Sequence, residues 1–203
     1  MLNQEHKKPV LIIIAGPNGS GKTSITSKIL EHKWIENCVY INPIIANETF
    51  GDWNSPDAVL KAANLAAQMR EECLANGNSL IFETVLSAND KITFIKKAKE
   101  RGFFIRLFFV GTESPTINAS RIAQRVLEGG HDVPITKIID RYSKSIANSC
   151  YVTKLADRTY IYDNSTDFED PKLLFRVNNG NEIKKYHSIN DWAKPIAAFI
   201  GSL

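Results

Sequence analysis

The sequence predicts an α/β fold in which helices cover a parallel β-sheet. Short apolar runs bounded by turn residues alternate with amphipathic stretches along the 203 residues, which is typical of strands that alternate with helices. Two of these runs, VLIIIA and FFIRLFFV, are almost entirely apolar or aromatic. Such runs are expected of strands that are covered on both faces.

Five apolar runs are candidate strands of this sheet. They span residues 10–15, 38–41, 79–83, 103–110 and 159–162. Beyond residue 163 the pattern changes: LLFRVNNGNEIKKY predicts a β-hairpin around Asn179-Gly180, and a short helix is expected at about 190–200. We expect one domain of residues 1–203, with a core at about 9–166 and an appendage at about 167–203.

Three helices are marked by start and stop signals. Ser55-Pro56-Asp57 begins the first and Asn76-Gly77 ends it, while Ser114-Pro115 and Gly129-Gly130 bound the second. The third is expected at about 135–155. The apolar stripes that we expect to face the core are Val59, Ala62, Ala66, Met69 and Cys73 on the first helix and Ile138, Ile139, Tyr142 and Ile146 on the third.

Charge and composition disfavour several classes of function. With 25 Lys and Arg against 22 Asp and Glu, the chain carries a formal charge of +3 and no continuous basic stripe, so we expect no nucleic-acid partner. No apolar run is long enough to span a bilayer or form a signal peptide, so we expect no membrane partner. Three cysteines without metal-type spacing indicate free thiols in a reducing compartment, hence a cytoplasmic location.

A glycine-rich loop follows the first predicted strand. Residues 16–23 read GPNGSGKT and match the phosphate-binding pattern G-x-x-x-x-G-K-[ST], the P-loop. Its glycines let backbone amides point inward, and the helix that begins near Lys22 adds a partial positive charge. Lys22 can reach the β- and γ-phosphates of ATP or GTP, and the Thr23 hydroxyl can bind Mg²⁺. The predicted nucleotide-binding residues here are Gly16, Pro17, Asn18, Gly19, Ser20, Gly21, Lys22, Thr23 and Ser24.

Charged residues after the loop favour a kinase. Glu83 ends the third predicted strand, at the edge where parallel sheets bind ligands, although a solvated acid is the alternative. Arg121 and Arg125 lie four residues apart on one helical face, which suits a lid that closes on phosphate. A solvated basic face explains the same spacing equally well. Arg141 is a candidate for a third phosphate contact.

These motifs together resemble the zeta-toxin family of P-loop kinases. The resemblance rests on GPNGSGKT, FETVLS, RIAQRVLEGGHDVPITKIIDRYSKSIAN and YIYDNS, and covers residues 10–166. It implies the P-loop NTPase/kinase fold with a five-stranded parallel sheet. Members of the family phosphorylate the sugar 3′-hydroxyl of UDP-N-acetylglucosamine with a purine triphosphate, and several are toxins that pair with an antitoxin protein.

The resemblance also implies roles for individual residues. Lys22 and Thr23 would hold the triphosphate and Mg²⁺, and Arg121 or Arg125 would stabilise the transferring phosphoryl group. A second set would line the acceptor site: Asn42, Glu48, Glu83, Thr84 and His131. A third set, Asp163, Asn164 and Ser165, would lie near the nucleotide base.

One position departs from the family pattern. The family has an aspartate just after the second strand, which takes the proton from the acceptor hydroxyl, whereas this sequence has Ile44 there. Asn42 cannot act as a base, so Glu48 or Asp52 would have to take the role of the missing aspartate. Three interpretations stay open: a UDP-amino-sugar kinase, a P-loop kinase for an antibiotic or a polynucleotide end, and a nucleotide-binding module without transfer activity.

Overall fold

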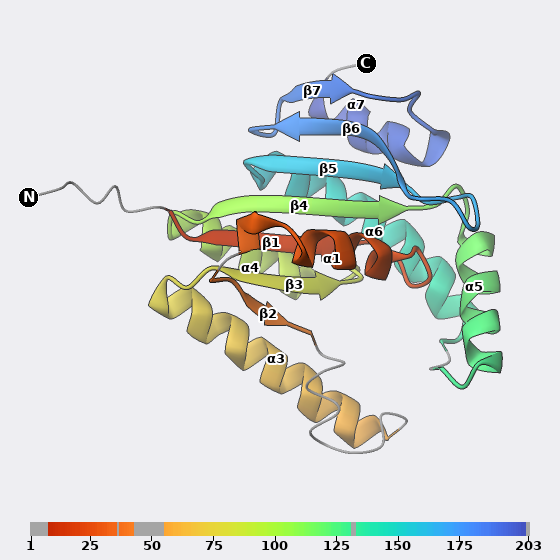
Figure 1. The fold of residues 1–203 in the computed structure, drawn as a ribbon, viewed down its shortest axis with the longest axis horizontal. Helices are drawn as coiled ribbons and strands as arrows, with labels where there is room; N and C mark the ends of the chain where they lie inside the picture. Colours follow the sequence, from red (N-terminus) through yellow and green to blue (C-terminus); the bar gives the residue numbers. More distant parts are fainter. Residues whose placement is uncertain (1–7, 36, 43–54, 131–132, 202–203) are drawn as a thin grey trace, which may run out of the picture.

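The computed structural model describes residues 8–35, 37–42, 55–130 and 133–201, which form a seven-stranded sheet flanked by helices (Figure 1). The strands are β1 (Val10–Ala15), β2 (Val39–Ile41), β3 (Leu80–Thr84), β4 (Phe104–Gly111), β5 (Arg158–Asp163), β6 (Lys172–Asn178) and β7 (Glu182–Lys185). The α-helices are α1 (Lys22–Leu30), α3 (Pro56–Asn76), α4 (Asn89–Glu100), α5 (Pro115–Leu127), α6 (Ile135–Leu155) and α7 (Lys194–Ile200). Two short 3₁₀ helices are η1 (Lys33–Ile35) and η2 (Asp191–Ala193).

The five predicted strands are confirmed, and they are parallel. The strand order is β2-β3-β1-β4-β5-β6-β7, so β1 lies between β3 and β4. The carboxyl ends of parallel strands meet at one edge of the sheet, and the residues that follow β1, β3 and β4 are therefore brought together there. The P-loop follows β1 and Glu83 lies at the end of β3, so the fold places both at this edge.

The predicted hairpin forms, but it belongs to the sheet itself. β6 pairs antiparallel with β5, and β7 pairs antiparallel with β6, which gives seven strands rather than the expected five. The reason is burial, since Leu174, Phe175 and Val177 are at most 2% exposed and join the main core. Helix α7 also packs into that core through Ile196 and Ile200.

The three marked helices are confirmed as α3, α5 and α6, and their apolar stripes mostly face the core. Two stripe residues do not: Val59 is 44% exposed and Ile139 is 50% exposed, because each lies at the margin of its helical stripe. One helix, α4, occupies a stretch in which the sequence analysis assigned no element. This helix buries only Phe94, Ile95 and Ala98, and its other residues include several lysines. Three buried residues are too few to show the apolar spacing that predicts a helix.

Two apolar clusters hold the sheet between its helices. On one face, in front of the sheet in Figure 1, lies α1. Its residues Ile25 and Ile29 pack in one cluster with residues of β1 and β4. On the other face lie α4, α6 and α7, behind the sheet in the same view, and they enclose the larger cluster. Within the described ranges, no helix is both long and apolar enough to cross a membrane.

Candidate active site at the carboxyl edge of the sheet

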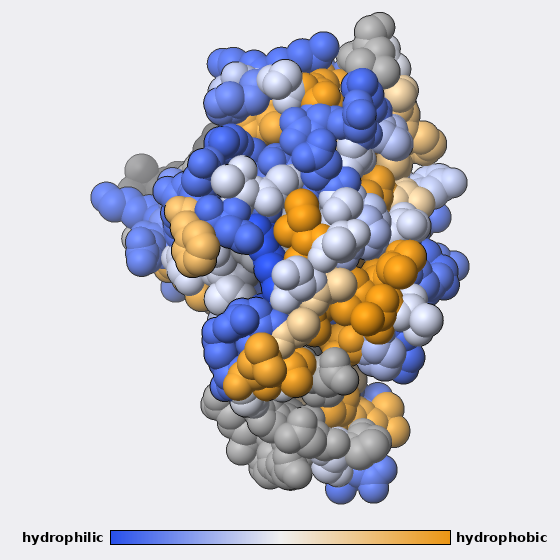
Figure 2. Space-filling view, turned by 90° about the vertical axis from the view of Figure 1, so that its right-hand side faces the viewer, coloured by the Kyte–Doolittle hydropathy of each residue, from blue (hydrophilic) through white to orange (hydrophobic). Residues whose placement is uncertain are grey.

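A cleft of about 550 Å³ opens at the carboxyl edge of the sheet. The P-loop and the start of α1 form one wall, and the loop from β3 to α4 forms another, with side chains of α5 and α6 closing it. Figure 2 views the molecule from this edge, where hydrophilic side chains occupy much of the surface. The residues that line the cleft are Asn18, Gly19, Gly21, Lys22, Thr23, Asn42, Ala63, Glu83, Thr84, Val85, Leu86, Ser87, Ala88, Asp90, Lys91, Arg125 and Arg141.

Lys22 folds back over its own loop. Its Nζ donates hydrogen bonds to the carbonyl oxygens of Gly16 at 2.8 Å and Pro17 at 3.0 Å. Burial lowers the pKa of Lys22 to about 8, while the charge of Glu83 acts in the opposite direction and that of Arg125 adds to the lowering. Lys22 lines the cleft, and an anion bound there would stabilise the charge of its ammonium group.

Close packing fixes the shape of the P-loop. Gly19 and Gly21 have φ angles of 76° and 84°, which favour glycine. A Cβ on Gly19 would lie 2.5 Å from the carbonyl oxygen of Asn118, and one on Gly21 would lie 2.1 Å from Nδ2 of Asn164. Because no side chain fits at these two positions, the loop can pack this closely against Asn118 and Asn164 only with glycine there. A tight glycine-rich turn of this kind is what a phosphate cradle requires.

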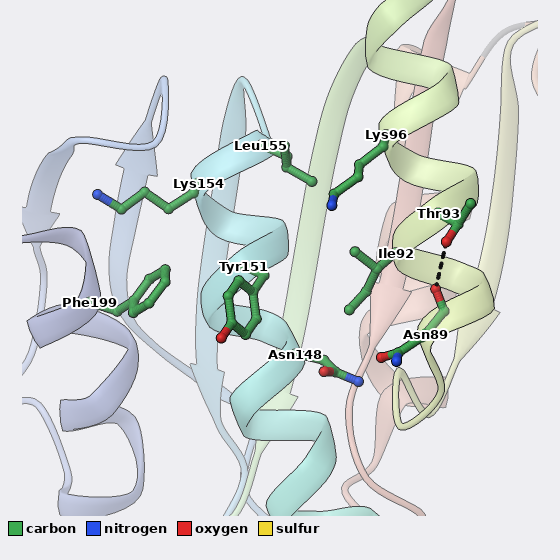
Figure 3. A pocket seen from close by; sticks show the side chains of 9 residues that line it. All are labelled: Asn89, Ile92, Thr93, Lys96, Asn148, Tyr151, Lys154, Leu155 and Phe199. Atoms are coloured by element: carbon green, nitrogen blue, oxygen red, sulfur yellow. Dashed lines mark hydrogen bonds between the residues drawn. The ribbon is translucent and has the colours of Figure 1, made fainter.

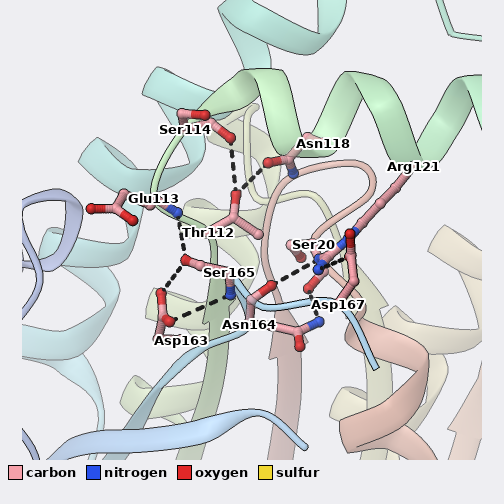
Figure 4. A network of polar contacts seen from close by, with 10 residues as sticks. All are labelled: Ser20, Thr112, Glu113, Ser114, Asn118, Arg121, Asp163, Asn164, Ser165 and Asp167. Carbon is pink, nitrogen blue, oxygen red and sulfur yellow. Dashed lines mark hydrogen bonds and ion pairs between the residues drawn. The ribbon is translucent and has the colours of Figure 1, made fainter. Parts of the chain in front are cut away.

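Two asparagines brace this loop from behind (Figure 4). Asn118 of α5 donates to the carbonyl oxygen of Asn18 at 2.6 Å, and Asn164 donates to that of Ser20 at 2.9 Å. Ser20 is fully buried, and its Oγ has no hydrogen-bond partner among the described residues. It is not among the residues that line the cleft, so its side chain lies inside the loop rather than facing a ligand.

The segment after β5 supports the site rather than lining it. The Oδ1 atom of Asp163 accepts from Trp192 Nε1 at 2.8 Å and from Ser165 Oγ at 2.7 Å. Asn164 is the brace described above, and neither it nor Asp163 or Ser165 is among the residues that line the cleft. Their predicted proximity to a nucleotide base stays a prediction, since the base would have to extend beyond this cleft.

The two arginines of α5 have different surroundings. Arg121 donates through Nε and NH2 to Asp167 Oδ1, at 2.8 and 2.6 Å, and through NH1 to the carbonyl oxygen of Asn164 at 2.8 Å. Figure 4 shows its guanidinium directed toward the β5–β6 loop. Arg125 instead lines the cleft, as does Arg141 of α6. The structure therefore brings Arg125, and not Arg121, to the same cavity as Lys22.

Glu83, near the end of β3, is held in a fixed orientation by two hydroxyl groups. Its Oε1 accepts from the Tyr40 hydroxyl at 2.7 Å and from Thr26 Oγ1 at 3.0 Å. Burial and the bond to Glu83 raise the pKa of Tyr40 well above its ordinary value, so the hydroxyl remains a donor. Asn42 donates to the same hydroxyl at 3.1 Å. Both of the bonds that Glu83 accepts go to Oε1, and Glu83 lines the cleft.

The loop after β3 completes the wall. Thr84 Oγ1 accepts from the backbone amide of Leu86 at 2.9 Å, and Leu86 has a φ of 57°, which is uncommon for a residue other than glycine. Asp90 and Lys91, at the start of α4, form an ion pair beside this loop. Burial alone would raise the pKa of Asp90, but the bond and charge of Lys91 hold it below its usual value.

Two sequence-predicted site residues, Glu48 and His131, lie outside the described residues, as do Ile44 and Asp52. Ser24 is exposed and does not line the cleft. Gly16 and Pro17 do not line it either, but their carbonyl oxygens accept hydrogen bonds from Lys22. The remaining predicted residues of the acceptor side, Asn42, Glu83 and Thr84, all line the cleft.

Mg²⁺ would have to be held mainly by a single hydroxyl and by phosphate. In the described part of the chain, no group of three or more His, Cys, Asp or Glu residues could hold a metal ion by itself. Thr23 lines the cleft one residue after Lys22, and the carboxylate of Glu83 shares that cavity. The hydroxyl of Thr23 is a hard oxygen ligand, so it fits a Mg²⁺ ion that arrives with a nucleotide.

Comparison with known proteins decides the family. The Zeta toxin family model matches residues 1–188, which is most of the chain. The chain belongs to the Zeta toxin family. A relative from Haemophilus influenzae, an uncharacterized protein, is 29% identical to this family member over 135 residues, which are 64% of this chain and 91% of the relative.

Solved structures support the P-loop kinase fold of this Zeta toxin family member. The PezAT toxin–antitoxin structure of Streptococcus pneumoniae has a TM-score of 0.60 and 17% identity, with 97% of this chain and 80% of that chain covered. The AvrRxo1-ORF1:AvrRxo1-ORF2 structure with ATP has a TM-score of 0.65 and 18% identity, with 96% of this chain covered. This chain spans 64% of the AvrRxo1 chain, so at these identities the likeness shows the fold.

Several residues of the zeta-toxin cleft were not found by sequence reasoning. Tyr40 and Thr26 bond to Glu83 from β2 and α1, and a sequence pattern gives no sign of such long-range contacts. Asp90 and Lys91 were missed because α4 was not assigned; the Ser-Ala-Asn-Asp stretch after the third strand was the available signal. Asn118 was missed because its role depends on the fold of the P-loop against α5.

Proposed function

We propose that this zeta-toxin family member transfers the γ-phosphate of ATP or GTP to a hydroxyl of a UDP-amino-sugar. One observation carries the proposal: a single cleft of about 550 Å³ contains the P-loop Lys22, the arginines Arg125 and Arg141, and the oriented carboxylate of Glu83. Positive groups for a phosphate chain and a carboxylate for an acceptor thus share one cavity. This is the arrangement that phosphoryl transfer requires.

The donor side of the reaction would be handled by the P-loop. Its amides and the start of α1 would hold the β-phosphate, and Lys22 would leave the carbonyls of Gly16 and Pro17 to meet the γ-phosphate. Arg125 and Arg141 would stabilise the charge that spreads over the phosphoryl oxygens in the transition state. Thr23 would hold a Mg²⁺ ion, whose charge would help to neutralise the triphosphate.

The acceptor side would be organised by Glu83. Its Oε1 is occupied by Tyr40 and Thr26, so its orientation is fixed and Oε2 can accept a hydrogen bond from an acceptor hydroxyl. Thr84, whose Oγ1 shapes the turn at Leu86, lies next to it in the cleft wall. Holding the hydroxyl in line with the phosphoryl group supplies much of the rate enhancement in such reactions.

The proton acceptor is a separate question. Two carboxylates of the described residues line the cleft, Glu83 and Asp90. Asp90 is a weak base because its ion pair with Lys91 keeps its pKa low. We therefore propose Glu83 as the group that orients the hydroxyl, and Glu48 and Asp52 as the candidates for the base that replaces the family aspartate at Ile44.

Coupled ADP release with a panel of UDP-sugars tests the proposal. The expected result is turnover that depends on Mg²⁺ and on a UDP-amino-sugar, with a phosphorylated sugar nucleotide as product. The Lys22→Ala variant should show no turnover above background. A panel in which no UDP-sugar stimulates ADP release would contradict the acceptor class. Aminoglycosides and 5′-hydroxyl oligonucleotides would then test the alternative acceptors.

A nucleotide-binding protein without transfer activity is the second candidate. The sequence observation that favours it is Ile44, which stands where the family has its catalytic aspartate. Its signature would be affinity for MgATP, measured by calorimetry, without ADP release with any acceptor. If Glu48→Gln or Asp52→Asn lowers turnover by about 10²-fold or more, a base is present and this candidate is excluded.

We also propose an antitoxin protein as partner and the cytoplasm as location. Two of the similar structures are complexes, PezAT and AvrRxo1-ORF1:AvrRxo1-ORF2, and the first is a toxin–antitoxin system. Cys38, Cys73 and Cys150 are not joined in a disulfide, which suits a reducing compartment. Rescue of growth by a neighbouring open reading frame, when this protein is overexpressed, tests the partner; growth that is normal without it would contradict a toxin role.

A further inference from the structure

A second cavity lies behind the acceptor loop, in a groove between α4, α6 and α7. Its volume is about 640 Å³, which is within the range of small-molecule sites. None of its lining residues belongs to the lining of the nucleotide cleft. They are Asn89, Ile92, Thr93 and Lys96 of α4, Asn148, Tyr151, Lys154 and Leu155 of α6, and Phe199 of α7 (Figure 3).

The groove has an aromatic and apolar surface that is open to solvent. Tyr151 and Phe199 are 55% and 42% exposed, and their rings pack edge to face with centroids 5.2 Å apart. Ile92 faces Tyr151 across the groove, as Figure 3 shows. Two exposed aromatic rings and an aliphatic side chain around one space are the usual surroundings of a bound ring or short apolar group.

The charge of the groove is positive and is not neutralised by the protein. On α4, Lys97 pairs with Glu71 at 3.3 Å and Lys99 pairs with Asp157 at 2.6 Å. Lys96, on the same helix, has no acidic partner among the described residues and extends into the groove near Leu155. Lys154 likewise has no acidic partner there, and its Nζ lies 5.8 Å from the ring of Phe199. Because Figure 3 shows Lys154 extending away from α4, Lys96 is the ammonium group that the groove offers to an anion between α4 and α6.

A hydrogen bond from a side chain of the groove to a backbone carbonyl connects this groove to the acceptor loop. Asn148, which points into the groove, donates from Nδ2 to the carbonyl oxygen of Leu86 at 2.9 Å. Leu86 is fully buried and has the unusual φ of 57°, and its amide bonds to Thr84 Oγ1. The first turn of α4 separates the two cavities, since Asn89 lines the groove while Asp90 and Lys91 line the cleft.

We propose that this groove is a binding site for a small amphipathic anion, and that its occupancy stabilises the acceptor loop at 84–88. The ring or apolar body of the ligand lies between Ile92, Tyr151 and Phe199, and its acidic group pairs with Lys96. The ligand restricts Asn148, whose bond to Leu86 holds the turn that presents Thr84. The groove acts in this way as a regulatory site for the acceptor half of the cleft.

An aromatic sulfonate, 8-anilinonaphthalene-1-sulfonate, is a suitable probe because it combines rings with one anionic group. Its fluorescence in a titration of the folded, nucleotide-free protein should saturate with one site per chain. Lys96→Ala should weaken binding about tenfold, and Tyr151→Ala should weaken it similarly. Lys97→Ala is the matched control, because it removes the same charge from the same helix at a residue that does not line the groove. The affinity of this variant for the probe should equal that of the wild type.

Hydrogen exchange tests the connection to the acceptor loop. A saturating amount of the probe should slow amide exchange at residues 84–88 in the wild type. Asn148→Ala, saturated at a higher probe concentration, should lose this protection. Non-saturable binding, equal weakening by Lys96→Ala and Lys97→Ala, or unchanged exchange at 84–88 would each overturn the proposal. Neither measurement needs nucleotide or turnover, so failure here is distinguishable from failure of the proposed kinase activity.

Discussion

Lys22 is the residue on which the nucleotide site most depends. In the free protein its ammonium group bonds to two carbonyl oxygens of its own loop, and burial lowers its pKa to about 8. A lysine in this state loses its charge within an accessible pH range, whereas an exposed lysine does not. The charge that would hold a triphosphate is therefore sensitive to pH in the free protein.

This sensitivity predicts a pH dependence of nucleotide affinity. Binding requires the ammonium form, and a bound triphosphate raises the pKa of Lys22, so binding is linked to proton uptake at alkaline pH. The dissociation constant of a nonhydrolysable ATP analogue with Mg²⁺ should be constant below pH 8. Above it, the constant should rise by up to about tenfold per pH unit. Calorimetry between pH 7 and 9.5 measures this dissociation constant. A dissociation constant that does not change over this range would contradict the lowered pKa of Lys22.

Glu83 should matter for the acceptor and not for the nucleotide. Removing its charge in Glu83→Gln leaves the Tyr40 and Thr26 hydroxyls without their charged acceptor, so the acceptor hydroxyl loses its orientation. We expect kcat to fall about 10²-fold with little change in the affinity for ATP. Glu71→Gln, an exposed glutamate of α3, is the control and should leave kcat unchanged. An unaffected kcat in Glu83→Gln would remove this residue from the site.

At the scale of elements, α5 combines two tasks. One turn carries Arg121, which ties the helix to the β5–β6 loop, and the next carries Arg125, which lines the cleft. The same helix braces the P-loop through Asn118. A movement of α5 would therefore change both the phosphate cradle and the position of Arg125, while the contacts of Arg121 oppose such a movement.

The two arginines provide a matched pair of variants. Arg121→Ala removes bonds to Asp167 and Asn164, which is expected to cost about 1 kcal/mol because Asp167 is largely exposed, and to lower Tm by about 2–4 °C. Arg125→Ala should leave Tm unchanged and lower kcat by about 10²–10³-fold. Thermal unfolding and ADP release distinguish the two. A large loss of kcat in Arg121→Ala at unchanged Tm would reverse the assignment.

At the scale of the whole molecule, the C-terminal segment completes the sheet. β6 covers the edge of β5, and Trp192 packs over Gly111, where a Cβ would lie 2.4 Å from the indole ring. The Trp192 indole also bonds to the buried carboxylate of Asp163, beside the brace that Asn164 provides to the P-loop. The segment thus contributes to the nucleotide site although no residue beyond 141 lines the cleft.

A truncation tests this integration. A chain of residues 1–166 would expose the edge of β5 and remove Leu174, Phe175, Val177 and Trp192 from the main core. We expect it to aggregate or to lack a cooperative unfolding transition, because an uncovered strand edge and a partly open core are both unfavourable. Circular dichroism with thermal unfolding measures this. A stable, cooperatively folded fragment would show that the segment is an appendage after all.

Much of this molecule follows from local sequence signals. Repeated turn residues and the VLIIIA run gave the five parallel strands, and GPNGSGKT gave the phosphate loop with its glycine conformations. The order of strands and the inclusion of the hairpin in the sheet depend on long-range pairing, which no local pattern encodes. For the same reason, spacing alone placed Arg121 and Arg125 on one face but could not show that Asp167 engages only Arg121.

The most direct test of the account is calorimetry of the folded protein with Mg²⁺ and nonhydrolysable ATP and GTP analogues. We predict saturable binding of at least one of them at one site per chain, with a dissociation constant of about 1 μM to 1 mM. Lys22→Ala should weaken this binding by at least about tenfold. Absence of binding to either analogue by protein with a normal unfolding transition would contradict the phosphate-binding cleft and the kinase function with it.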